Sequence, residues 1–75
     1  MSNLSDIPLL YNGDAYYIHV QLTHSVLVLG VTIYYDNQNS VGVFERYRDL
    51  DPETKKSVIN QIKKRYPQTP IQFND

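Results

Sequence analysis

One apolar run limits the folds open to this chain more than any other feature. Residues 25–35, Ser-Val-Leu-Val-Leu-Gly-Val-Thr-Ile-Tyr-Tyr, contain no charge and no proline and are rich in β-branched and aromatic side chains. Such side chains favour a pleated, packed strand over a helix. Strand alternation places on one face Leu27, Leu29, Val31, Ile33 and Tyr35, and on the other Val26, Val28, Gly30, Thr32 and Tyr34. Because both faces are mostly apolar, we expect a central strand that is covered on both sides.

A β-hairpin is expected ahead of this strand. Asn12-Gly13 separates two apolar runs, and both residue types tolerate the positive φ that a type I′ turn requires. A two-residue loop pairs Tyr11 with Asp14, and this register keeps the apolar side chains of both strands on one face. Pro8 has no backbone donor, which makes the first strand an edge of the sheet.

The link from the hairpin to the central strand is short and lies around His24-Ser25. If Leu22 lies opposite Leu27, then Val20 lies opposite Leu29, and the apolar face of the hairpin continues across the central strand. This register makes Leu29 a core residue, and it turns Val26 and Val28 toward the opposite face.

The next segment predicts a turn and a fourth strand. Residues 36–40 form a polar cluster, and residues 41–47 form a strand pattern. A five-residue loop turns Val41 and Val43 inward, whereas a four-residue loop turns Phe44 inward. We favour the five-residue loop.

A helix is predicted over residues 52–65. Asp51 can cap it, Pro52 suits its first position, and Pro67 ends it. Its apolar stripe comprises Val58, Ile59, Ile62 and Tyr66. The tail at residues 71–73 adds a short fifth strand or docks on the core. Residues 1–75 therefore predict a single α+β domain with two layers, in which one C-terminal helix covers one face of a four-stranded antiparallel meander.

Composition narrows the classes of function. The 75 residues include no cysteine, so disulfides and thiolate metal sites are excluded, and a chain this short has little core to spare. Residues 1–45 carry four acidic and no basic residues, and residues 46–75 carry seven basic and four acidic ones. We see no secretory signal and no apolar run long enough to span a membrane, and we expect a cytoplasmic protein.

Catalytic and metal-binding patterns are weak. His19 and His24 are the two histidines, and on a strand entering a turn they point to opposite sides. Ser25 beside His24 is a sequence neighbour without a nucleophile motif. No glycine-rich phosphate loop is present. The sequence therefore predicts no enzyme, no cofactor and no metal site.

The sheet face away from the helix is the candidate site. Its predicted partner-binding residues are Tyr17, His19, Val26, Val28, Thr32, Tyr34 and Arg46. Apolar and tyrosine side chains in such a patch are typical of protein contacts. We expect a small non-catalytic protein-binding module, a regulator or inhibitor that occupies a partner's surface, and a homodimer through the open sheet face or an exposed strand edge. The alternative is binding of single-stranded nucleic acid by the same aromatic side chains.

Overall fold

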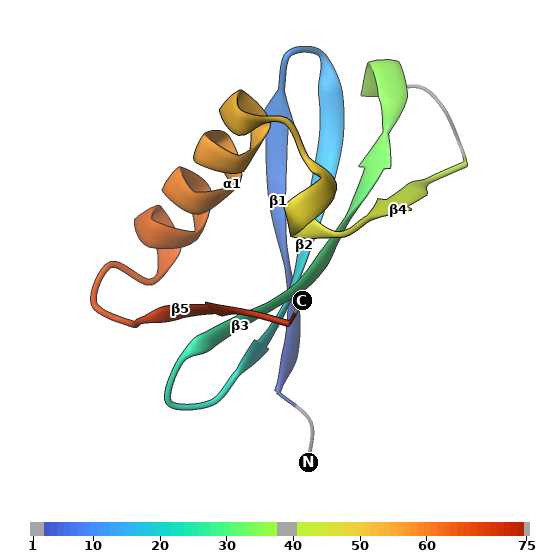
Figure 1. Cartoon of the computed structure of the whole chain (residues 1–75). Helices are drawn as coiled ribbons and strands as arrows, with labels where there is room; N and C mark the ends of the chain where they lie inside the picture. Colours follow the sequence, from blue (N-terminus) through green and yellow to red (C-terminus); the bar gives the residue numbers. More distant parts are fainter. Residues whose placement is uncertain (1–2, 38–40, 75) are drawn as a thin grey trace.

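The described residues form one sheet and one α-helix, arranged as two layers (Figure 1). The computed structural model describes residues 3–37 and 41–74. The elements follow in the order β1 (Leu4–Tyr11), β2 (Asp14–Leu22), β3 (Val26–Tyr34), the 3-10 turn η1 (Tyr35–Asn37), β4 (Val43–Glu45), the 3-10 turn η2 (Tyr47–Asp49), α1 (Pro52–Arg65) and β5 (Ile71–Phe73). Strands β1 to β4 form an antiparallel meander, and β5 pairs with β3 in parallel. The predicted α+β class and the fifth strand are confirmed.

The first hairpin has the predicted register. Tyr11 pairs with Asp14, and β1 forms an edge of the sheet. Asn12 and Gly13 both have positive φ, 54° and 84°, as a type I′ turn requires. Gly13 supplies the more extreme of these angles at no steric cost, because it has no Cβ.

A β-bulge between β2 and β3 corrects the predicted register of the central strand. Ile18 pairs with Val31 as expected, but Val20 pairs with Val28 and Leu22 pairs with Val26. The register therefore leaves Leu29 without a partner on β2. An extra residue in one strand interrupts the alternation of its side chains. The β3 side chains that precede the bulge therefore point to the opposite face from the one expected.

The bulge reverses the predicted faces of the residues at the start of β3. Val26 and Val28, assigned to the partner-binding face, are 0% and 2% exposed and belong to the core. Leu27 and Leu29, assigned to the core face, are half-buried and lie outside the core cluster. Tyr35 differs for another reason: β3 ends one residue earlier, and Tyr35 begins η1 and is exposed. The sequence does not show where the extra residue lies, because the run is apolar on both faces.

The core lies between the sheet and α1. Its members are Ile7, Tyr16, Ile18, Val20, Val26, Val28, Val31, Ile33, Leu50, Val58 and Ile62. The helix has the predicted bounds, and Asp51 caps it by accepting a hydrogen bond from the Thr54 backbone N–H at 3.3 Å. Val58 and Ile62 of the predicted stripe are buried, and Tyr66 packs against the core. Figure 1 shows α1 lying to one side of the strands.

The fourth strand is shorter than predicted. Val43 pairs with Ile33 and so lies on the core side, which confirms the favoured loop, although its side chain remains 38% exposed. Val41 lies outside the strand and is exposed, so its predicted inward position is wrong. The predicted polar turn falls partly on residues 38–40, which lie outside the described residues. Beyond β4, the ring of Tyr47 stacks on Phe73 of β5 with a centroid separation of 4.3 Å.

Candidate functional site: the open sheet face

The sheet face opposite α1, here called the open face, presents a mixture of apolar and polar side chains. Its side chains alternate with the buried ones and come from four strands: Leu4, Asp6, Pro8, Leu10, Ala15, Tyr17, His19, Gln21, Thr32, Tyr34 and Phe44. Leu4 is 62% exposed, Leu10 68% and Phe44 58%. Within residues 3–37 and 41–74, no helix or strand covers this face.

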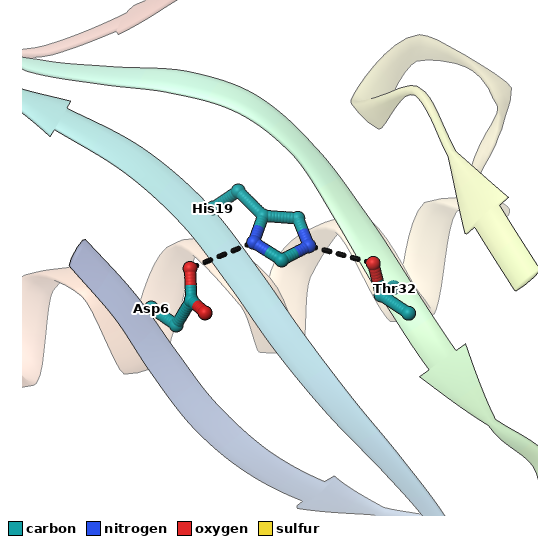
Figure 2. Close-up of polar contacts among 3 residues, drawn as sticks. All are labelled: Asp6, His19 and Thr32. Atoms are coloured by element: carbon teal, nitrogen blue, oxygen red, sulfur yellow. Dashed lines mark hydrogen bonds and ion pairs between the residues drawn. The ribbon is translucent and has the colours of Figure 1, made fainter. Parts of the chain in front are cut away.

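A hydrogen-bonded network crosses the open face from β1 to β3 (Figure 2). His19 Nδ1 lies 2.7 Å from Asp6 Oδ1, and His19 Nε2 lies 2.6 Å from Thr32 Oγ1. The register explains the first contact, because Asp6 and His19 are direct cross-strand partners. A carboxylate can only accept, so Nδ1–H donates to Asp6, and in the neutral imidazole Nε2 accepts from the Thr32 hydroxyl.

Two glycines let aromatic rings lie close to this network. The Phe44 ring stacks beside the His19 imidazole with a centroid separation of 6.2 Å. It lies over Gly30, where a Cβ would overlap the Phe44 ring. A Cβ at Gly42 would press in the same way against Thr32 and Tyr34, at 2.6 and 3.0 Å. The absence of a side chain at both glycines is therefore what allows the Phe44 and Tyr34 rings to lie this close to the backbone.

A shallow hollow lies next to the network. Its walls are formed by Asp6, Tyr17, His19, Thr32 and Tyr34. The rings of Tyr17 and Tyr34 meet edge to face, with centroids 5.7 Å apart. Four of these five residues, all except Asp6, were predicted from the sequence, and the structure brings them together.

The other predicted site residues lie elsewhere. Val26 and Val28 are in the core, as described above. Arg46 does not line the hollow; its Nε donates to Asp49 Oδ2 at 3.1 Å, and both side chains are exposed.

Asp6 and Phe44 were not among the predicted site residues. Asp6 could have been found from the hairpin register alone, because the register places it opposite His19. The favoured five-residue loop already turned Phe44 toward the open face, and its pairing with Thr32 agrees with that loop.

The edge of β1 is closed by two features. Pro8 has no N–H, and its carbonyl oxygen accepts a hydrogen bond from Gln61 Nε2 of α1 at 3.0 Å. A second strand adding to this edge would lack a donor at Pro8 and would have to displace Gln61. The open face is therefore a better docking surface than this edge.

The order carboxylate, imidazole, hydroxyl is also that of an acyl-transfer triad, in which the imidazole takes the proton of the attacking hydroxyl. Such chemistry requires N–H donors aimed at the developing oxyanion. Thr32 lies inside β3 and is paired on both sides, with Tyr17 and with Phe44. The backbone amides around it are engaged in these two ladders, so the sheet does not aim them at an oxyanion. Among the described side chains, no group of three or more His, Cys, Asp or Glu residues is placed to hold a metal ion.

Comparison with known proteins adds no assignment to this geometry. Family models, curated proteins and solved structures gave no match to the chain. Within the part of the chain that the structure describes, no helix is both long and apolar enough to cross a membrane.

Proposed function

We propose that this protein is a small non-catalytic protein-binding module, a regulator or inhibitor, whose open face docks on a protein surface and first of all on a second copy of itself. The observation that carries the proposal is the exposure of Leu4, Leu10 and Phe44 on a face that α1 leaves uncovered. Apolar side chains gathered on one face, around a few polar groups, are typical of protein contacts.

A second copy is the simplest occupant. The molecule measures 34 by 27 by 21 Å. Specific interfaces bury at least roughly 500 Å² on each partner. Even the smallest face of the molecule, which is bounded by the two shorter dimensions, is large enough for such an interface. A two-fold axis lets one self-complementary patch cover both copies. Eleven apolar residues are buried in the part of the chain that the structure describes, and a domain of this size gains stability from any further apolar area that it buries.

Nucleic acid is the alternative occupant, since Tyr17, Tyr34 and Phe44 present rings on which bases could stack. Charge argues against it. Asp6 lines the hollow, and Arg46 is paired with Asp49 away from it. A polyanion needs several cations beside the stacking rings, and the described residues that line the hollow include no lysine or arginine.

The oligomeric state tests the proposal. We expect sedimentation of the wild-type chain at tens to hundreds of micromolar to show a dimer. Leu10→Glu places a charge on the open face and should give a folded monomer, because Leu10 is too exposed to contribute much to folding. Asn60→Glu, on an exposed position of α1, adds the same charge to the other layer and should remain dimeric. A wild-type chain that stays monomeric refutes the self-association, and a mobility shift of a short single-stranded oligonucleotide would instead support the nucleic-acid alternative.

A further inference from the structure

The Asp6–His19–Thr32 network places a titratable group inside the face that we propose to be buried. Along β1, Asp6 lies between the exposed Leu4 and Leu10. A partner that covers both leucines therefore also covers the network. Because the side chains of His19 and Asp6 are still 29% and 59% exposed in the single chain, docking would remove water from both.

The net charge of the network depends on the protonation state of the imidazole. With neutral His19 the network carries the single negative charge of Asp6, and with protonated His19 it becomes a neutral ion pair. Moving an unpaired charge out of water is costly, whereas a hydrogen-bonded ion pair costs much less. In a face-to-face dimer the cost applies twice, and the two negative networks also repel each other.

We infer that self-association through the open face is coupled to proton uptake by His19, so that the dimer becomes tighter as the pH falls. This inference rests on the proposed dimer. Histidine is the side chain that ordinarily changes its charge between about pH 5 and 8. The Thr32 hydroxyl tolerates both states, since it donates to a bare Nε2 and accepts from a protonated one.

The groups that face His19 come from three neighbouring strands. The described side chains that face it are Asp6 from β1, Thr32 from β3 and the uncharged Phe44 ring from β4. The hollow adds Tyr17 and Tyr34, and tyrosine phenols ordinarily titrate near pH 10. Carboxylates are ordinarily ionised above about pH 5.

The test is the dimer dissociation constant of the full chain, measured by sedimentation equilibrium from about pH 8 to about pH 5.5 at constant ionic strength. Each proton taken up on association changes the constant by up to about tenfold per pH unit. We expect the wild-type dimer to tighten at least tenfold over the range. Far-UV circular dichroism at each pH checks that the chain stays folded.

Three variants identify the group responsible. His24→Gln removes the other histidine, which is exposed in the β2–β3 loop, and should keep the wild-type pH profile. His19→Gln should make the dissociation constant independent of pH. Asp6→Asn should reverse the slope, since protonating His19 then creates an unpaired buried cation and weakens the dimer at low pH. A structural role for the network alone would not produce this reversal.

The outcomes separate the two proposals. A wild-type chain that is monomeric at every pH refutes the proposed dimer, and the coupling falls with it. A dimer whose dissociation constant does not change with pH, or whose pH profile is lost in His24→Gln rather than in His19→Gln, overturns the proton coupling and leaves the dimer standing.

Discussion

Truncating the unpaired bulge residue Leu29 and its neighbour Val28 in turn tests the register of the central strand. Val28 is 2% exposed, and Val28→Ala removes two carbon atoms from the core. At about 0.8 kcal/mol for each buried methylene, the lost transfer free energy is about 1.6 kcal/mol. The cavity that remains adds about 1 kcal/mol. We therefore expect the free energy of unfolding to fall by about 2–3 kcal/mol.

Leu29→Ala is the matched change at the next residue. It removes one carbon atom more, but the Leu29 side chain is half-buried and lies outside the core cluster. About half of the full transfer term applies and no closed cavity forms, so we expect a loss of about 1 kcal/mol. Leu29→Ala removes more atoms than Val28→Ala, but it should lower the free energy of unfolding by less.

Urea unfolding followed by circular dichroism measures both variants. The protein concentration should be equal and low, so that self-association does not add to the apparent stability. The thermal midpoint of Val28→Ala should fall by roughly 10–20 °C, given the 4–8 °C per kcal/mol that is usual for a domain of this size. If Leu29→Ala proves the more damaging change, the strand alternates without a bulge and our assignment of its two faces is wrong.

Two further changes probe the hairpin turn and the helix cap. Gly13→Val should lower the free energy of unfolding by about 1–3 kcal/mol in the same urea experiment, because valine resists a φ of 84°. Gly13→Asn should lower it by clearly less, since asparagine tolerates the left-handed region. The hydrogen bond from the Thr54 hydroxyl holds the pKa of Asp51 below its ordinary value of 3.8. The stability that this cap contributes is therefore fully present above about pH 4, and it is lost as the pH falls through the lowered pKa. The thermal midpoint of Asp51→Ala should therefore lie below that of the wild type at neutral pH and approach it in acid, and a difference that stays constant down to about pH 2 would contradict the cap's role.

Local signals in the sequence were sufficient for the elements whose chemistry is unambiguous. Asn12-Gly13 determines a turn type and hence a register, and Asp51 followed by proline marks a helix start. These signals work because only a few residue types tolerate the required backbone angles or supply the required acceptor. The fold class followed from these signals together with the strand patterns, and strand alternation placed Tyr17, His19, Thr32 and Tyr34 on the face that carries the hollow.

The parts that could not be predicted depend on contacts between distant residues. Leu27, Val28 and Leu29 are similar in size and polarity, so the choice of which one becomes the extra residue depends on how β2, β5 and α1 pack around them. The favoured loop length predicted that Phe44 turns away from the core, but not which residues its ring would contact. The position of the Phe44 ring over Gly30 can be derived only when the pairing of β3 with β4 is known.

The bulge also determines what kind of interface the open face can make. With strict alternation, Val26 and Val28 would have joined Tyr34 in a mostly apolar patch of the kind found in obligate dimers. The extra residue instead sends both valines into the core, where they stabilise the single chain. What remains on the open face is a polar centre, Asp6 with His19 and Thr32, bordered by exposed apolar side chains. Such a surface costs more to desolvate than an apolar one and therefore suits a partner that binds and dissociates. The proton coupling that we propose for His19 follows from the same desolvation cost.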